Sequence, residues 1–419
     1  MSNKSVSEFY ARLREACKRP HIGDVAVVCD VPLYPVGGWQ SRVMPSTYKS
    51  RNDKEKESPD KDRPRYHIEK RPSLADSNVI EDIVVLNSVQ AQANAIEAGH
   101  QFLQIPQVLV KSKTLDREFS VNEFSHRIYD ADIRDTVSED GQTPFAMTPL
   151  GKEVYSIDPV RTMKAVLRTN PLALLLGCWA STVVQLVGEK GFKWPRLVMS
   201  EIIAGLRSET LKSASKLGPM SAGRGEQAFR KKASIEWTNE DKSADADYET
   251  IKNSELNLTN IPPTLSDVGD SKAAGGVTVG WITERFQLSL QGLRAKLNTG
   301  NPAVDGDTRY MLACMAIALH GMKSDNYYLR SGCDLARQSQ ENLYRIEHFA
   351  ETNGWAITPQ DALAAYEEAR KLLPVEVYDP SLRVHLFCSE PLEQLPHWSL
   401  SGRPEVNGQK KSRGKKRAG

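Results

Sequence analysis

The fold is decided by GGVTVGWITERFQLSLQGLR (275–294), which is followed shortly afterwards by DTRYMLACMAIALHGM (307–322). In the first stretch, apolar residues alternate up to Trp281 and resume one position out of phase from Phe286. A period of two predicts β-structure, and the change of phase predicts two strands or one bulged strand that breaks at Glu284 and Arg285. The second stretch is apolar on nearly all sides and predicts a buried helix.

The elements predicted outside these two stretches indicate the fold class. DVAVVCDVPLYPV (24–36) predicts a strand broken by its two prolines, preceded by a helix that Ser7 caps. IEDIVVL (80–86) leads into a helix with Asn87 as its expected N-cap, and Thr358 with Pro359 opens another helix. The predicted order is a strand, a helix, further strands and a helix, interrupted by long polar segments. This order predicts an α+β fold with insertions.

Composition narrows the class of protein. The chain has 419 residues, 40% hydrophobic and 26% charged, with no apolar leader at its start, so we expect a globular protein in the cytoplasm. The uncharged stretch 169–188 is interrupted by polar residues and is expected to be core rather than a membrane span. The six cysteines and eight histidines show no metal-ligand spacing, so we expect free, largely buried thiols, no metal and no cofactor.

Charge is distributed unevenly along the chain. Residues 207–232 carry seven basic and two acidic side chains, whereas residues 236–255 carry seven acidic and two basic ones. Residues 49–71 are strongly charged with almost nothing apolar, which predicts a mobile insertion, and residues 406–419 read as a disordered basic tail. Charge runs are most often solvated faces, so the basic block alone is a weak indication of nucleic-acid binding.

The helix expected after Asn87 has two different faces. Gln90, Asn94, Glu97 and Gln101 share one stripe, opposite a more apolar stripe. Carboxamides near a helix N-terminus can contact phosphates and sugars without demanding one base sequence. An ordinary surface helix would carry the same pattern.

Candidate catalytic groups lie in HRIYDADIRD (126–135) and at His320. An Asp-x-Asp pair can hold Mg²⁺, and a histidine can act as a general base. Arg127 and Arg134 are interspersed with the carboxylates, so structural ion pairs are the simpler interpretation. No phosphate-binding loop, nucleophile elbow or kinase signature is present in the sequence.

Several ordered motifs together resemble one family, the RAMP-superfamily backbone subunit (the "Cas-seven" class) of type I-G CRISPR effector complexes, formerly type I-U. The motifs SVQAQAN (88–94) and PRLVMSEIIAG (195–205) are the most distinctive. The full set of matching segments is 36–48, 84–97, 126–136, 170–181, 193–205, 260–263 and 275–294.

The resemblance implies an RRM-like (ferredoxin-like) palm with finger and thumb insertions. The palm with its finger would occupy 1–207 and 276–335, and the thumb 208–275. Residues 336–405 would form a C-terminal helical segment. The function implied is that of a non-catalytic subunit of a Cascade complex, which oligomerises along a CRISPR guide RNA and presents it for pairing with target DNA in antiviral defence.

The implied partners are the guide RNA (crRNA), target DNA in the assembled complex, other copies of the chain, a large subunit and a guide-capping and processing subunit, with no membrane. A rival interpretation is a RAMP-type endoribonuclease that processes guide RNA or cleaves target RNA; another is a protein unrelated to CRISPR. From the resemblance and the charge pattern, the predicted RNA contacts are Arg42, Gln90, Gln92, Asn94, Arg134, Arg207, Lys212, Lys216, Arg224, Arg230, Lys231 and Lys232.

Overall fold

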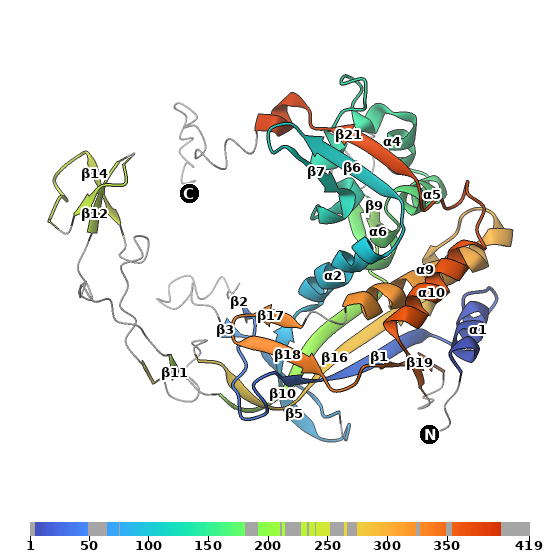
Figure 1. The fold of residues 1–419 in the computed structure, drawn as a ribbon, viewed down its shortest axis with the longest axis horizontal. Helices are drawn as coiled ribbons and strands as arrows, with labels where there is room; N and C mark the ends of the chain where they lie inside the picture. The colour runs from blue at the N-terminus through green and yellow to red at the C-terminus, as the bar shows by residue number, and fades with distance from the viewer. Residues whose placement is uncertain are drawn as a thin grey trace, which may run out of the picture.

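The protein has an α+β fold built on antiparallel sheets (Figure 1). The computed structural model describes residues 5–48, 65–74, 76–180, 192–209, 212–213, 228–232, 234–238, 240–251, 264–265, 275–323, 327–348 and 354–394.

A nine-stranded sheet forms the centre of the molecule. Its main path runs β17–β18–β1–β16–β10–β5–β4, and β19 and β20 extend it beside β1. All pairings in it are antiparallel. The strands are β1 (Ala26–Pro35), β4 (Ile68–Pro72), β5 (Ile80–Asn87), β10 (Val198–Glu209), β16 (Val277–Ser289), β17 (Tyr328–Arg330), β18 (Cys333–Arg337), β19 (Asn342–Glu347) and β20 (Trp355–Ile357).

Four of these strands follow a familiar order. Along the chain they come as β1, β10, β16 and β19, but in the sheet they lie as β19–β1–β16–β10. Helix α2 (Val89–Glu97) falls between the first two, and α9 (Pro302–Met322) between the last two. This order, fourth-first-third-second with a helix in each crossover, is that of a β-α-β-β-α-β unit.

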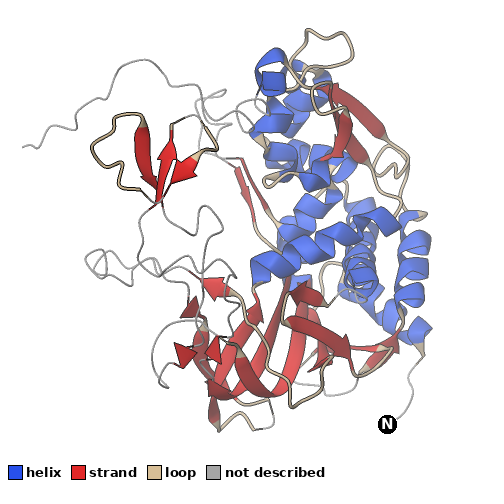
Figure 2. Cartoon of the chain, turned by 60° about the vertical axis from the view of Figure 1, so that its left-hand side comes forward, coloured by secondary structure: helices blue, strands red, loops and turns tan. Residues whose placement is uncertain are grey.

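Helices cover one face of the sheet (Figure 2). Alternate residues of β1, such as Val27 and Leu33, are fully buried on that face. Every residue of α9 from Thr308 to Gly321 is buried, as the apolar sequence predicts. Because each buried aliphatic side chain contributes roughly 1.5–3 kcal/mol, this helix is a major source of core stability.

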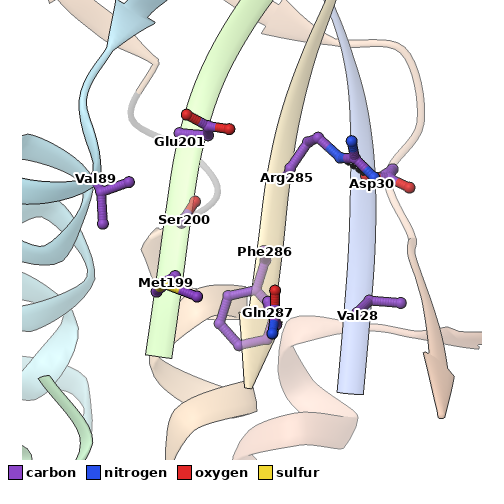
Figure 3. A pocket seen from close by; sticks show the side chains of 9 residues that line it. All are labelled: Val28, Asp30, Val89, Met199, Ser200, Glu201, Arg285, Phe286 and Gln287. Atoms are coloured by element: carbon purple, nitrogen blue, oxygen red, sulfur yellow. Dashed lines mark hydrogen bonds and ion pairs between the residues drawn. The ribbon is translucent and has the colours of Figure 1, made fainter. Parts of the chain in front are cut away.

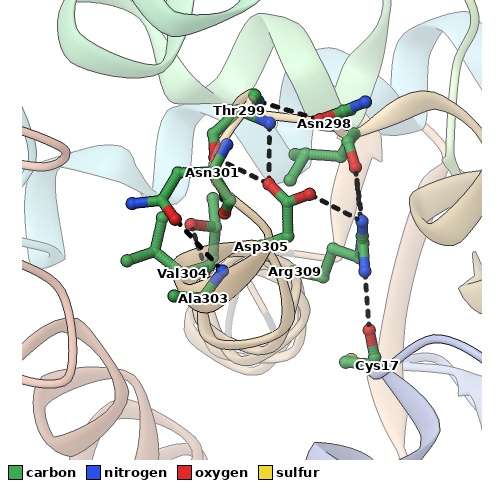
Figure 4. A network of polar contacts seen from close by, with 11 residues as sticks. Cys17, Asn298, Thr299, Asn301, Ala303, Val304, Asp305 and Arg309 are labelled. Carbon is green, nitrogen blue, oxygen red and sulfur yellow. Dashed lines mark hydrogen bonds and ion pairs between the residues drawn. The ribbon is translucent and has the colours of Figure 1, made fainter.

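A polar network fastens the start of α9 (Figure 4). The carboxylate of Asp305 accepts hydrogen bonds from the backbone N–H and the hydroxyl of Thr299, both at 2.7 Å. The buried Arg309 donates to the carbonyls of Leu297 and Cys17. These contacts join the 297–301 turn to α1 (Val6–Ala16), so the N-terminal helix is held against the core.

A lobe of short helices and two small sheets follows α2, and it is placed above the main sheet in Figure 1. Its sheets are β21–β6–β7, with β21 parallel to β6, and β8–β9. The lobe comprises η2 (Ala98–Phe102), β6 (Gln107–Ser112), β7 (Arg117–Ser120), η3 (Val121–Glu123), η4 (Arg127–Tyr129), α3 (Ala131–Arg134), η5 (Phe145–Met147), α4 (Pro149–Val154), α5 (Pro159–Thr169), α6 (Pro171–Leu176), β8 (Cys178–Ala180), β9 (Phe192–Trp194) and β21 (Arg383–Phe387).

The remaining elements are two helices that pack against α9, short strands of loops, and the strands of the segment between β10 and β16. That segment contributes a three-stranded sheet, β13–β12–β14, here called the insertion sheet, and a two-stranded sheet, β11–β15. The elements are β2 (Thr47–Tyr48), β3 (Arg65–Tyr66), β11 (Lys212–Ser213), β12 (Ala228–Lys231), β13 (Trp237–Thr238), β14 (Tyr248–Ile251), β15 (Thr264–Leu265), α8 (Leu290–Lys296) and α10 (Pro359–Arg370).

Several local expectations need correction. The first helix is capped by Ser5, not Ser7, and α2 by Ser88, not Asn87. Strand β1 continues through Pro32, because the partner on that side of β1 changes there from β19 to β18 and no ladder hydrogen bond is lost. The capping box at Thr358 is confirmed.

Strand β16, which covers most of 275–294, is one continuous element. β16 has its register irregularity opposite Gly205 and Leu206, near Gly280, rather than at Glu284 and Arg285. Glu284 itself is buried on the helix-covered face, where an acidic residue disguised the true alternation. The prediction of one bulged strand is therefore confirmed, but the bulge lies near Gly280 and not at Glu284 and Arg285 as predicted.

Two domain expectations differ from the structure. Residues 65–71 form β3 and most of β4 and are not part of a mobile insertion, while 49–64 lie outside the described residues. Residues 336–394 are not only helical: β19 pairs with β1, and β21 pairs with β6. Strands of this segment complete sheets begun more than two hundred residues earlier, a pairing that no local pattern reveals. Residues 395–419, including the basic tail, lie outside the described residues.

The cysteine expectation is confirmed for the thiols. All six are free, five are buried and Cys388 is partly exposed. No helix among the described residues has the length and apolar character needed to cross a membrane.

Candidate nucleic-acid interface

Helix α2 presents two exposed carboxamides, Gln90 in its first turn and Asn94 about one turn further on. Ser88 caps the helix by accepting a hydrogen bond from the backbone N–H of Ala91 at 3.3 Å. Gln90 and Asn94 are exposed, whereas Ala93 and Ile96 are buried, so the expected amide and apolar faces are both present. An uncovered helix start with amide side chains can donate hydrogen bonds to an anion.

Gln92 is a correction to the predicted set of RNA contacts. Its side chain is fully buried, and among the described residues neither its amide nitrogen nor its amide oxygen has a hydrogen-bond partner. Residue 92 lies two positions from Gln90 and Asn94, on the side of the helix that faces the core. It therefore cannot contact a ligand at the surface.

The C-terminal half of α2 is tied to the lobe by a buried ion pair. Arg127 binds Glu97 through two hydrogen bonds of 2.7 and 2.8 Å and also donates to the carbonyl of Gly177 at 2.8 Å. Burial raises the pKa of Glu97 and outweighs the opposing attraction of Arg127. Arg127 has a φ of 54°, a backbone conformation that non-glycine residues rarely adopt, so its position is held by these contacts. The interpretation of Arg127 as a structural ion-pair partner is confirmed.

A shallow pocket of about 560 Å³ adjoins α2. Asn94, Glu97 and Gln101 line it together, as expected of residues on one stripe. Its opposite wall is Asn122 to Ser125, from the lobe. The sequence predicted the stripe but gave no sign of the wall, because the two are joined only by the tertiary fold.

The loop that carries Arg42 is docked beside the start of α2. Arg330 donates to the carbonyl of Leu86 at 2.9 Å, to the carbonyl of Met44 at 3.2 Å and to the hydroxyl of Ser46 at 2.5 Å. Ser46 in turn donates to the Leu86 carbonyl at 2.9 Å. Arg330 was missed from the sequence, since nothing near it marks a positioning role. Arg42 is exposed.

The base of the 210–276 segment reaches the same place. The backbone N–H of Gly276 donates to the hydroxyl of Tyr66 at 3.1 Å, and the neighbouring His67 carbonyl accepts from the N–H of Val85 at 3.0 Å. Val43 pairs with Val277. The end of the long segment at Gly276 therefore lies next to the loop of Arg42. Through Tyr66 and His67 it is also linked to Val85, three residues before Ser88. Figure 1 shows β2, β3 and β17 grouped beside that end of α2.

Arg207 lies at this edge of the sheet. It is exposed near the end of β10, and its guanidinium lies over Gly280 of β16, where an added Cβ would come within 2.3 Å of Nε. Glu209 pairs with Val277, so Arg207 and Arg42 flank the same short stretch of β16 from two sides. The fold thereby brings together two predicted cations that are far apart in the sequence.

The insertion sheet explains the reversal of charge along the chain. Arg230 pairs with Glu249 at 3.0 Å, Lys231 lies 3.5 Å from Glu236, and Lys232 donates to the Ala246 carbonyl at 2.6 Å. The acidic block thus contacts the basic block of the same chain. These ion pairs are exposed, and each contributes only about 0–1 kcal/mol to stability. Their cations can therefore bind another anion at little cost in free energy.

The other predicted contacts are less informative. Arg134 lies in α3, where its guanidinium binds Asp135 through two hydrogen bonds of 2.6 Å. Lys212 is in β11, and Lys216 and Arg224 lie outside the described residues. Of these, Arg134 is the one whose side chain the structure describes, and it lies in α3 of the lobe and not at the start of α2.

Two of the candidate catalytic residues, Asp130 and His320, make structural contacts. Asp130 is the N-cap of α3 and accepts from the N–H of Asp132 at 3.1 Å; it also accepts from the N–H of the exposed His126. Burial, with the nearby charges of Asp130 and Asp135, raises the pKa of Asp132. His320 is buried in the core and stacks on Phe286. Among the described residues, no group of three or more His, Cys, Asp or Glu side chains could hold a metal ion.

A second pocket, of about 320 Å³, is lined by residues of β1, β10 and β16 and by Val89, the first residue of α2 (Figure 3). It contains Asp30, which pairs with Arg285 at 3.0 Å, and Glu201, which pairs with Arg71. Asp30 also accepts from Arg345 at 3.0 Å. The carboxylates in this pocket are therefore neutralised by arginines of the same chain.

The fold defines an α+β protein. Where the long insertion leaves the main sheet, exposed amide and guanidinium side chains form a surface suited to binding an anion. Residues 27–207 match the family of CRISPR-associated protein GSU0053. The match spans less than half of the chain, from β1 through the lobe to β10, and it supports a CRISPR-associated family for this protein. No curated protein matches the sequence.

Proposed function

We propose that this protein is a guide-RNA-binding backbone subunit of a type I-G CRISPR Cascade complex, the Cas-seven class of RAMP proteins, and that it is not itself an enzyme. Copies would assemble along one crRNA, with the β-α-β-β-α-β unit as the RRM-like palm, the lobe as finger and 208–275 as thumb. The guide would then be held for pairing with target DNA, so that base pairing supplies the specificity.

One observation carries this proposal. The exposed amides of α2, the loop of Arg42 and the base of the insertion meet at one place, through the contacts of Arg330, Ser46 and Tyr66. Guanidinium and amide groups bind phosphate and sugar oxygens without reading bases, which is the recognition that a guide of variable sequence requires. The family match supports the CRISPR context.

The partners proposed for this subunit are the crRNA, other copies of the chain, a large subunit, a guide-capping and processing subunit, and target DNA in the assembled complex. The exposed cations of the insertion sheet support a role in holding RNA or a neighbouring copy, because their own ion pairs are weak.

The test is assembly of the purified full chain on single-stranded RNAs of graded length. Native mass spectrometry should give a copy number that rises stepwise with RNA length, and the RNA should stay intact. A fixed monomer on every RNA, or no bound RNA at low salt, would overturn the proposal.

A RAMP-type endoribonuclease is the second candidate. The observation in its favour is the half-buried Asp132, whose pKa is raised, six residues after the exposed His126. Cleavage of RNA by the wild-type chain that His126→Ala and Asp132→Asn abolish would establish it. Intact RNA after incubation with Mg²⁺ would support the backbone role instead.

A further inference from the structure

The β8–β9 hairpin presents an aromatic and a cationic side chain side by side. Trp179 pairs directly with Lys193 across the two strands, so both side chains project from the same face. Lys193 is exposed, and 57% of Trp179 is accessible. The neighbours of Trp179 in the strand, Cys178 and Ala180, are buried, so the strand has one anchored face and one presented face.

The root of the hairpin is rigid. Trp194, the cross-strand partner of Cys178, is buried and donates from its indole nitrogen to the carbonyl of Leu174 at 2.9 Å. Gly177 has a φ of 83° and lies so close to Arg196 that an added Cβ would be 3.1 Å from the Arg196 backbone nitrogen. Trp179 is therefore presented from a fixed base.

The same root is tied to helix α2. The carbonyl of Gly177 accepts from Arg127, which is the partner of Glu97 on α2. One buried guanidinium thus sets the hairpin relative to the helix whose first turn carries Gln90. A ligand that follows α2 from its N-terminus would meet the hairpin at the far end.

We propose that Trp179 and Lys193 form a nucleobase-stacking subsite for single-stranded RNA, in which the indole stacks on one base and the ammonium group pairs with an adjacent phosphate. Stacking on an exposed aromatic accepts any base, and a neighbouring cation supplies the electrostatic contact. The subsite rests on the proposed function and extends it, since neither residue was among the predicted contacts.

The charge beside Trp179 favours RNA over a protein surface. Lys193, which is exposed, is the direct cross-strand partner of Trp179, and Arg196 lies at the root of the hairpin, where its backbone nitrogen adjoins Gly177. An exposed tryptophan alone would suit an apolar partner, whereas a tryptophan beside a cation suits a ligand with both flat rings and negative charge.

The test compares binding of labelled single-stranded RNA to the full chain carrying Trp179→Ala, Trp179→Phe or Lys193→Gln. Loss of one stacked base should weaken binding by about 5-fold or more, and phenylalanine should restore most of it. Trp179→Ala should leave the salt dependence unchanged, whereas Lys193→Gln should reduce the slope of log affinity against log salt by about one. Leu372→Ala, an exposed apolar residue after α10, is the control and should bind like the wild type.

The outcomes separate this inference from the proposed function. If the wild type binds RNA and Arg42→Ala with Arg207→Ala weakens it, but Trp179→Ala does not, only the subsite is wrong. If Trp179→Ala reduces assembly mass at unchanged RNA affinity, the tryptophan contacts protein and the subsite is again wrong. Absence of RNA binding by the wild type overturns both. RNA substituted with 5-iodouridine should crosslink to Trp179, identified by peptide mass spectrometry.

Discussion

The main sheet and the insertion sheet both hold opposite charges together, but they do so in opposite surroundings. Glu284 is fully buried in β16 and contacts Lys323 at 2.6 Å, Tyr327 at 2.7 Å and Ser200 at 2.6 Å. In the insertion sheet, the side chains of Arg230 and Glu249 are each more than two-fifths exposed. The contacts of Glu284 are shielded from water, whereas the ion pair of Arg230 and Glu249 is exposed to it.

The comparison teaches where charge serves the fold and where it is free for a ligand. A buried carboxylate that loses its cation keeps its full desolvation cost, so the Glu284 network specifies how α9, Lys323 and Tyr327 pack on the sheet. An exposed ion pair can be replaced by contacts with another charged group at little cost in free energy. Cations that can be transferred to RNA are therefore expected at the insertion and at Arg42 and Arg207, not in the core.

The largest effect is expected from Lys323→Met. This change leaves the Glu284 carboxylate buried without its closest cation and should lower the free energy of unfolding by about 3–5 kcal/mol. Denaturant titration followed by circular dichroism measures it. The matched control is the double variant Glu284→Leu with Lys323→Met, which removes both charges and should be less destabilised than the single one. Equal stability of Lys323→Met and the wild type would show that the pair does not act as described.

The second prediction is loss of stability in acid from the same network. Burial opposes ionisation of Glu284, but Lys323 and His320 outweigh it and hold its pKa well below the ordinary 4.5, while burial lowers the pKa of His320 below 6.5. The unfolded chain therefore binds protons first as pH falls below about 6.5, and again near 4.5, so stability should decrease through both ranges.

Unfolding free energies measured between pH 7.5 and 4 check this prediction. In His320→Gln, the decrease that begins near pH 6.5 should be smaller, and the decrease near pH 4.5 should remain. A stability that stays flat, or rises, as the pH falls would contradict the assignment of a neutral histidine beside an ionised glutamate.

The third prediction concerns the interface. Replacing Arg42 and Arg207 with alanine should reduce the salt slope of RNA binding by about two while leaving the thermal unfolding midpoint nearly unchanged, because both side chains are exposed. Arg285→Ala is the matched control, because its guanidinium pairs with Asp30 at 3.0 Å, and it should bind RNA like the wild type. An unchanged slope in the double variant would remove this edge from the interface.

The smallest effect is expected from Arg230→Gln. Its ion pair with Glu249 is solvent-exposed, so unfolding free energy should change by no more than about 1 kcal/mol. Chemical denaturation measures this, with Glu249→Gln as the reciprocal variant. A loss of several kcal/mol would mean that the insertion sheet depends on its charges as the main sheet does.

Much of the core could be read from periodicity. The strand at 277–289, the buried helix after residue 302 and the cap at Thr358 follow from local patterns. Alternation failed at Glu284 because its burial depends on Lys323 and Tyr327, which come from another part of the chain. The strands within 336–394 were missed because their partners, β1 and β6, are remote in sequence.

The interface could be predicted only in part. Exposure of Gln90 and Asn94 follows from helical geometry, and so does the burial of Gln92, which the resemblance had assigned to RNA. Arg330 and Tyr66 could not be found, because each acts by positioning backbone from a distant segment. Trp179 was hidden in an apolar run and is distinguished only by its exposure in the folded chain.

The central claim is that copies of this chain hold one guide RNA. Its most direct test is to purify the chain from cells that carry a CRISPR array and the neighbouring subunits, and to size and sequence the RNA that accompanies it. The account predicts RNA of uniform guide length in a large particle with several copies of the chain. A monomer free of RNA, or RNA of random length and sequence, would contradict it.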